Sequence, residues 1–140
     1  MKERTAEDIA GPMPEFGKHL GLLLVEADAG HVVMDLPVTP ALANRNGVMH
    51  GGAILGLTDN CGGTAAWVHL KPGENTVTLE SKVNFLRPIR IGDVARATAT
   101  PVHIGRTTQV WDIAVTRGDG KLAARVTQTQ MTILWQEPED

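Results

Sequence analysis

The stretch GGAILGLTDNCGGTAAW, residues 51–67, decides the fold. It lacks the alternation of a strand, and its small and apolar residues share one face of a helix, namely Ala53, Ile54, Leu57, Cys61, Thr64, Ala65 and then Val68. The helix contains five glycines, and each interior glycine costs about 1 kcal/mol relative to alanine. A surface without side chains usually lets another backbone approach closely. We therefore predict a central helix with a sheet wrapped tightly around it.

The rest of the chain is typical of strands. Two are predicted before the helix, at about 20–27 and 30–37, with Ala29-Gly30 as the turn between them. Four follow it at 76–85, 93–102, 107–117 and 121–134, all rich in Val, Thr and Ile. The order is β-β-α-β-β-β-β, without the βαβ alternation that indicates a parallel sheet. We predict an α+β protein with an antiparallel sheet.

Size and charge narrow the classes of protein. A chain of 140 residues has the length of one domain, so we expect a single domain over 1–140, in which 1–15 form an N-terminal arm or a short helix. A net charge of −3 gives no general attraction for nucleic acid. Cys61 is the only cysteine, and no apolar run approaches the length of a membrane span. The first residues lack the apolar core of a signal peptide. We expect a cytoplasmic protein that binds neither nucleic acid nor a membrane.

His50-Gly51-Gly52 stands at the start of the predicted helix. The N–H groups of a first helical turn are unpaired, and the helix dipole places partial positive charge there. The N–H of Gly51 or Gly52 can therefore polarise a carbonyl oxygen, as an oxyanion hole does in acyl transfer. The alternative is that the glycines serve only the tight packing of the helix on the sheet.

Asp59 is a carboxylate among the small and apolar residues of this helix. It is either an exposed residue on the free face or a partly buried acid with a chemical task. Gly51 and Asp59 are eight residues apart, so an intact helix separates them by about 12 Å. One subunit cannot bring both to the same carbonyl group. Two copies with antiparallel helices can, so chemistry that uses both residues requires a dimer.

The pattern Asn44-x-x-Gly47-x-x-His50-Gly51-Gly52, with Asp59 nine residues after the histidine, resembles the signature of hotdog-fold acyl-CoA thioesterases. It is most similar to the phenylacetate-degradation-type (PaaI-like) branch. Stretches 36–40, 83–88, 92–93, 103–107 and 120–122 are also similar, so the resemblance covers residues from about 20 to 133. It implies the hotdog fold, in which an antiparallel sheet wraps around a central Gly-rich helix.

The resemblance also implies roles for individual residues. Asp59 matches a catalytic carboxylate that acts as general base or as nucleophile, and the Gly51 N–H matches the donor to the thioester carbonyl. Asn44 matches a side chain that positions the thioester and the attacking group, while His50 supports the loop and the helix start. Thr78, early in the next strand, matches a hydroxyl that orients the water. These groups meet across a homodimer interface, and we expect two dimers to pair as a homotetramer.

Coenzyme A carries phosphates, for which arginine is a natural partner. Arg87 and Arg106 lie in loops beside strand ends and in stretches that resemble the family, so we predict that they bind substrate together with Gly52 and Gly105. The alternative for each arginine is a solvated turn residue. Tryptophan side chains either line an acyl pocket or pack in the core or between subunits, and the chain has three of them, Trp67, Trp111 and Trp135.

Thioester hydrolysis suits this set of residues, because a thioester is already activated and needs only a positioned water, a base and an oxyanion donor. The five histidines show no spacing typical of metal ligands. We therefore predict an enzyme that hydrolyses a small, medium or aromatic acyl-CoA, without a metal or a cofactor other than the CoA of the substrate. Two alternatives are a hotdog-fold hydratase or dehydratase, and a non-catalytic acyl-CoA-binding module.

Overall fold

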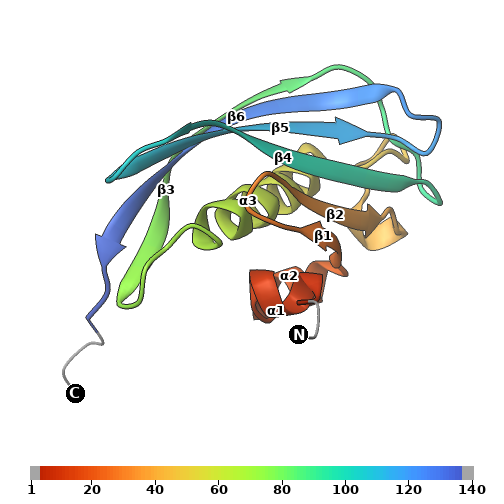
Figure 1. Cartoon of the computed structure of the whole chain (residues 1–140). Coiled ribbons are helices and arrows are strands. Elements are labelled where there is room, and N and C mark those ends of the chain that lie inside the picture. Colours follow the sequence, from red (N-terminus) through yellow and green to blue (C-terminus); the bar gives the residue numbers. More distant parts are fainter. Residues whose placement is uncertain (1–3, 137–140) are drawn as a thin grey trace.

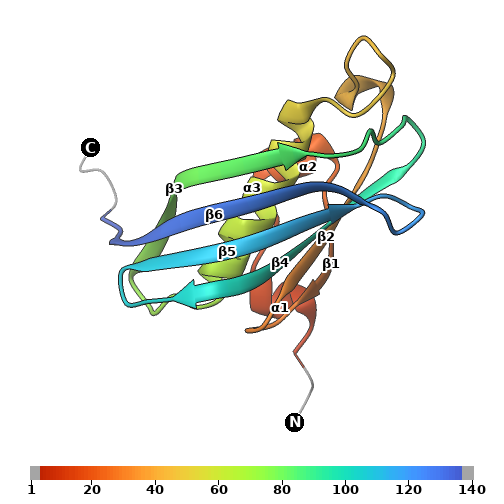
Figure 2. The ribbon, with the colours of Figure 1, turned by 90° about the horizontal axis from the view of Figure 1, so that it is seen from above.

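Six strands form one antiparallel sheet that curves over a long helix, α3 (Gly51–Trp67), as Figures 1 and 2 show. The computed structural model describes residues 4–136, so the first three residues of the predicted arm and the last four of the predicted domain lie outside the described residues. The strands lie in the order β1-β2-β4-β5-β6-β3, and their bounds are Leu23–Ala27 for β1, Val32–Pro37 for β2, Glu74–Phe85 for β3, Val94–Ile104 for β4, Thr108–Thr116 for β5 and Leu122–Leu134 for β6. The predicted order β-β-α-β-β-β-β and the limits of the central helix are confirmed.

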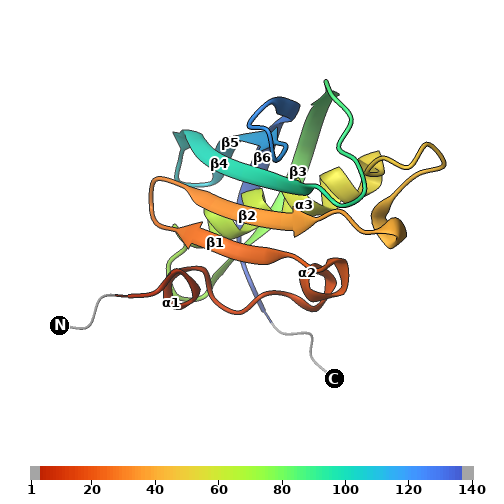
Figure 3. The same ribbon diagram turned by 90° about the vertical axis from the view of Figure 1, so that its right-hand side faces the viewer.

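Two short helices precede the sheet, α1 (Ala6–Ala10) and α2 (Glu15–Leu20), and they lie across α3 from strands β4 to β6 (Figures 1 and 3). A further turn of 3-10 helix, η1, spans Pro40–Leu42. The first strand was predicted from about residue 20, which is too early, because α2 ends at Leu20 with Gly21 as its C-cap and β1 begins at Leu23. No helix within residues 4–136 has the length and apolarity that a membrane crossing needs.

The boundaries of α2 follow from its flanking residues. Pro14 precedes the helix, and Gly21 ends it in the left-handed conformation with a φ of 90°, which matches the preference for proline at helix starts and glycine at helix ends. A helix of six residues is not stable alone. Its stability comes from packing, since Leu20 of α2 lies directly against Gly56 of α3.

The glycines of α3 are needed for close approach. A Cβ atom on Gly56 would lie 2.8 Å from Cδ1 of Leu20, and one on Gly62 would lie 2.8 Å from Cδ1 of Ile113 and 2.9 Å from Nε2 of Gln128. All three distances are shorter than ordinary van der Waals contact. The sheet does wrap around this helix as predicted, but the groups that approach its glycines are side chains and not another backbone.

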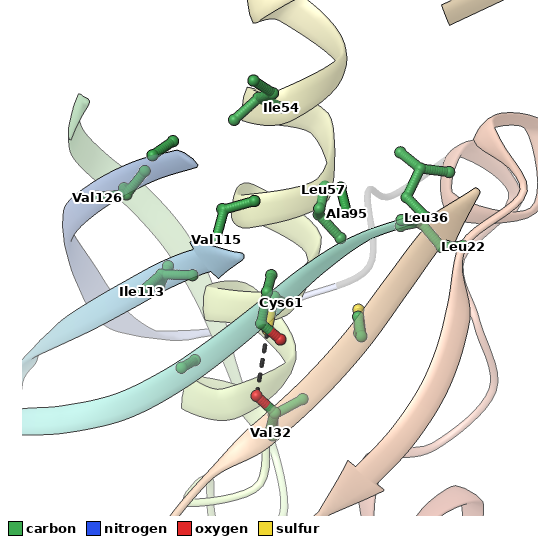
Figure 4. Close-up of a cluster of buried hydrophobic side chains, with 14 of the residues drawn as sticks. Leu22, Val32, Leu36, Ile54, Leu57, Cys61, Ala95, Ile113, Val115 and Val126 are labelled. Carbon is green, nitrogen blue, oxygen red and sulfur yellow. Dashed lines mark hydrogen bonds between the residues drawn. The ribbon is translucent and has the colours of Figure 1, made fainter. Parts of the chain in front are cut away.

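The core lies between α3 and the concave face of the sheet (Figure 4). Leu57 and Cys61 of the helix belong to this cluster together with Ile113 and Val115 of β5 and Val126 of β6, and all five are fully buried. The thiol of Cys61 donates a hydrogen bond to the carbonyl oxygen of Val32 at 3.4 Å. Of the helical face predicted from the sequence, Thr64 and Val68 are half-buried, and the other members are buried.

Strand β3 forms one edge of the sheet and contains a bulge. Thr78 pairs with Gln130 of β6, and after the extra residue Leu79 the pairing resumes so that Ser81 lies opposite Gln128. An extra residue reverses the alternation of side chains along a strand. Thr78 and Ser81 consequently both face the helix, although they are three positions apart.

Candidate active site

His50 is the N-cap of α3. Its backbone is extended, and its Nδ1 accepts a hydrogen bond from the Gly52 N–H at 2.8 Å, which satisfies one of the unpaired donors of the first turn. The Gly51 N–H donates to no acceptor within residues 4–136. Of the two glycines considered as oxyanion donors, Gly51 therefore has its N–H available, and the N–H of Gly52 is already used by the cap.

The loop before α3 brings Asn44 next to this helix start. Oδ1 of Asn44 accepts a hydrogen bond from the Asn46 N–H at 2.9 Å, which fixes the orientation of its amide group. Asn44 and Gly51 line the same cavity of about 370 Å³, together with Phe85 and Arg87. We call this space the Gly51 cavity. The structure thus places three of the predicted site residues together.

Asp59 lies eight residues after Gly51 in α3, and its carboxylate is exposed. Its Oδ1 accepts two hydrogen bonds, from the Thr78 hydroxyl at 2.8 Å and from Nε2 of Gln128 at 3.1 Å. The structure therefore places Thr78, one of the predicted site residues, directly beside Asp59. Both donors come from the two strands at the edge of the sheet, β3 and β6.

A network of polar side chains supports these two donors. Gln130 donates from Nε2 to the Thr78 hydroxyl oxygen at 3.0 Å, and Thr76 donates to Oε1 of Gln130 at 3.3 Å. Ser81 donates to Oε1 of Gln128. The two glutamines are almost completely inaccessible, with 0% and 1% of their surface exposed. They form a buried polar layer next to the carboxylate of Asp59.

Sequence reasoning missed both glutamines. The signal that could have found them is the alternation in β6, where the residues that face the helix are Ala124, Val126, Gln128 and Gln130. Glutamine stands there at two positions where the pattern predicts apolar side chains. A buried amide needs hydrogen-bond partners, so two amides in succession indicate a polar feature on the opposing helix.

A second cavity, of about 510 Å³, opens beside Asp59. We call it the Asp59 cavity. Its walls include the N-terminal segment around Pro12, the ring of Phe16 on α2 and the indole of Trp67 at the end of α3, with Thr78 and Gln130 at its polar side. Of the other two tryptophans, Trp111 is buried in the core and Trp135 is exposed, and neither lines this cavity.

The two cavities share no lining residue. Gly51 and Asp59 both belong to the intact helix α3, so the spacing of about 12 Å expected from its rise applies. Within one chain, the helix-start donor and the carboxylate accordingly face different spaces, and a single bound carbonyl group cannot reach both.

The two arginines that were predicted to bind substrate do not lie together. Nη1 of Arg87 donates to the carbonyl oxygen of Leu122 at 2.8 Å, so this guanidinium is partly engaged by backbone. Gly105 and Arg106 lie in the turn between β4 and β5, where a Cβ atom on Gly105 would lie 2.9 Å from the Thr108 carbonyl oxygen. The antiparallel pairing puts this turn at the opposite end of the sheet from Arg87. One chain does not bring the two arginines together.

Other reactive groups do not form a competing centre. Burial raises the pKa of the Cys61 thiol to about 12, which leaves almost no thiolate to act as a nucleophile near neutral pH. Among the described residues, no group of three or more His, Cys, Asp or Glu side chains is arranged to hold a metal ion.

Comparison with known proteins shows the family to which the chain belongs. Residues 46–124, more than half of the chain, match the profile of the thioesterase superfamily. A putative esterase of Haemophilus influenzae is 35% identical over 104 residues, which cover 74% of this chain and 75% of that protein. The proofreading thioesterase EntH of Klebsiella pneumoniae is 33% identical, with 69% and 70% covered. The 1,4-dihydroxy-2-naphthoyl-CoA hydrolase of Listeria monocytogenes is 34% identical, with 74% and 83% covered.

Solved structures show the same architecture. A thioesterase from H. influenzae superposes with a TM-score of 0.87 at 30% identity, covering 97% of this chain and 95% of that one. The PaaI protein of the phenylacetic acid degradation operon of Escherichia coli gives a TM-score of 0.79 at 30% identity, with 84% and 83% covered. A hypothetical thioesterase of Streptococcus pneumoniae, solved with coenzyme A, gives 0.74 at 29% identity, with 83% and 88% covered.

The chain belongs to the thioesterase superfamily, and the predicted hotdog fold is confirmed. Its class of activity is thioester hydrolysis, in agreement with the prediction from the motif. This membership favours a hydrolase over the two alternatives, a hydratase or dehydratase and a non-catalytic binding module.

Proposed function

We propose that the protein hydrolyses an acyl-CoA thioester to the free acid and CoA in a site shared by two subunits. Asp59 of one subunit acts as general base or nucleophile, and the Gly51 N–H of the other polarises the thioester carbonyl. The observation that carries the proposal is the Asp59 carboxylate, which is held by Thr78 and Gln128 and faces an open cavity. It is an exposed base beside a space large enough for an acyl group.

The reaction can follow either of two routes through these residues. As general base, Asp59 takes a proton from a water molecule while the hydroxide adds to the carbonyl carbon, and the C–S bond then breaks to release CoA as the thiol after proton transfer. As nucleophile, Asp59 adds to the carbonyl carbon, expels the thiolate and forms an anhydride that water then hydrolyses. In both routes negative charge develops on the carbonyl oxygen, where a helix-start N–H is most stabilising.

The edge of the sheet supports a homodimer. Strand β3 is an edge strand of twelve residues, and it exposes large apolar side chains at Val77, Leu79 and Phe85. A long apolar edge of this kind is normally covered by another strand. We propose that β3 of a second copy covers it, which would bring the antiparallel α3 helices side by side, and that two such dimers form a homotetramer.

The Asp59 cavity supports a small, medium or aromatic acyl group, because Phe16 and Trp67 give it an apolar wall beside the catalytic carboxylate. The similarity to a hydrolase named for an aromatic acyl-CoA supports the aromatic class. For the thioester end we propose that Asn44 positions the thioester and the attacking group, while His50 supports the loop and the helix start. Further contacts would come from Gly52, Arg87, Gly105 and Arg106, and no metal or additional cofactor is required.

The proposal predicts that Asp59→Asn abolishes hydrolysis of short, medium and aromatic acyl-CoAs, because an amide can neither accept the proton from water nor attack the carbonyl. Turnover is measured as released CoA thiol. Asp112→Asn serves as the control, since Asp112 pairs with Arg125 on the other face of the sheet. We expect both variants to fold and to keep their oligomeric state, and near-normal turnover by Asp59→Asn would exclude this residue from catalysis.

A further inference from the structure

Two glutamine side chains occupy buried positions of the sheet where apolar side chains would be expected. Gln128 and Gln130 are buried on the inner face of β6, in line with Ala124 and Val126. Burying an amide is unfavourable unless its donors and acceptor find partners. Both glutamines find theirs in the direction of Asp59, which indicates a purpose connected with that carboxylate.

The hydrogen bonds through Gln130 have a defined direction. Thr76 donates to Oε1 of Gln130, so the NH₂ end of this amide faces Thr78. An amide nitrogen only donates, so the Thr78 oxygen must accept this bond. The hydroxyl hydrogen of Thr78 is thereby left to point at Oδ1 of Asp59, 2.8 Å away.

The hydrogen bonds through Gln128 run the same way. Ser81 donates to Oε1 of Gln128, and this fixes the other end of the amide as the donor to Asp59. The bulge at Leu79 makes the arrangement possible, because regular alternation from Thr78 would turn Glu80 and not Ser81 toward the helix. Each glutamine thus lies opposite a hydroxyl residue of β3.

The two series of hydrogen bonds, one through Gln130 and one through Gln128, end on the same carboxylate oxygen. Oδ1 of Asp59 accepts from Thr78 and from Gln128, whereas no donor within residues 4–136 bonds to Oδ2. A carboxylate held at one oxygen cannot rotate freely, and its second oxygen keeps a fixed position. We propose that Gln128 and Gln130 are positioning residues for hydrolysis, which hold Oδ1 so that Oδ2 is the oxygen that acts on water or on the thioester.

This inference rests on the proposed role of Asp59, and its first test is a pair of substitutions that remove the amides but keep side-chain length. Gln128→Met and Gln130→Met are each expected to lower kcat by about 10- to 100-fold, since a misplacement of about 1 Å can have that effect. KM for the acyl-CoA should stay within about twofold, because the glutamines do not bind the substrate.

Gln109→Met is the matched control. Gln109 is a third buried glutamine, but it accepts a hydrogen bond from the Trp111 indole and donates to the Ala66 carbonyl oxygen, far from Asp59. We expect this variant to lose thermal stability as the other two do, and to keep the kcat of the unchanged protein. A loss of kcat that simply follows the loss of stability in all three variants would overturn the proposal.

A double-mutant cycle tests whether Gln130 acts on Asp59 through Thr78. If Gln130 acts only through Thr78, Gln130→Met lowers kcat in the normal protein but causes no further loss in a Thr78→Val background. A purely structural role for Gln130 would give the same additional loss in both backgrounds. If the methionine variants do not fold, Ser81→Ala and Thr76→Val remove the hydrogen bonds to Gln128 and Gln130 at half-buried positions. Unchanged kcat in both variants would contradict the positioning role of the glutamines.

The outcomes separate the two proposals. An active Asp59→Asn variant would refute the proposed catalytic role itself. An inactive Asp59→Asn variant, together with glutamine variants whose kcat equals that of Gln109→Met, would leave that role intact and overturn only the positioning of Asp59 by Gln128 and Gln130.

Discussion

At the start of α3, two adjacent glycines differ in what their N–H groups do. The Gly52 N–H bonds to the ring of His50, whereas the Gly51 N–H has no acceptor within the described chain. Phe85 lies against Gly51, with its ring atom Cζ 3.0 Å from the position of a Cβ atom there. The proposed oxyanion function therefore falls on one backbone atom, and a single substitution can test it.

We predict that Gly51→Pro lowers kcat by about 10²- to 10³-fold, the usual effect of removing one oxyanion donor. Proline lacks the N–H but is tolerated at the first position of a helix. His50 already has the extended backbone, with φ −64° and ψ 139°, that a residue before proline requires. Gly51→Ala keeps the N–H and adds the same Cβ contact with Phe85. Equal losses in both variants, measured as released CoA, would point to crowding and not to the missing donor.

The sequence motif predicts the site residues of the helix and of its preceding loop, because these residues follow each other along the chain. Thr78 was also predicted, through the resemblance of its position early in the next strand. Gln128 and Gln130 were not, because their task depends on a pairing partner in β3 and on the bulge at Leu79. Neither the partner strand nor an extra residue in it can be recognised from a local pattern.

Among the elements, α3 depends on glycine for its packing on the sheet. Gly62 lies under Ile113 and Gln128, whereas a Cβ atom on the next residue, Gly63, would meet only Nε2 of Gln130, at an ordinary 3.6 Å. The two glycines are adjacent in the same helix, so their intrinsic helix propensities are equal. Any difference between them in response to alanine measures the packing alone.

We predict that Gly62→Ala destabilises the protein by about 1–2 kcal/mol, because overpacking outweighs the gain of about 1 kcal/mol in helix propensity. Gly63→Ala should stabilise it by about 0.5–1 kcal/mol. The free energy of unfolding in urea checks both values. Stabilisation by Gly62→Ala would show that Ile113 and Gln128 can move aside, against the packing argument.

The elements that carry strong periodicity were predicted within a few residues, and the Gly-rich helix was predicted at its observed limits. Helix α2 was missed because six residues carry too little periodicity to distinguish a helix from the start of a strand. Its boundary signals, Pro14 and Gly21, were present. The prediction did not use them as the two ends of a helix.

For the whole molecule, the decisive fact is that the two halves of the proposed site face separate cavities of one chain. A two-fold axis beside β3 would join the Asp59 cavity of one subunit to the Gly51 cavity of the other. Each dimer would then hold two equivalent sites, and neither subunit would be active alone. Arg87 and Arg106 lie far apart in one chain, but Arg87 of one subunit and Arg106 of the other could then contact the same substrate.

Complementation between two inactive variants tests this shared site most directly. Asp59→Asn and Gly51→Pro are each expected to give inactive homodimers, whereas a mixed dimer contains one site in which both changes meet and one in which both groups are intact. Co-expression in equal amounts should restore about one quarter of the normal acyl-CoA hydrolysis, since half of randomly paired dimers are mixed and have one intact site. Mixed dimers that stay as inactive as their parents would show that each site takes both groups from a single chain.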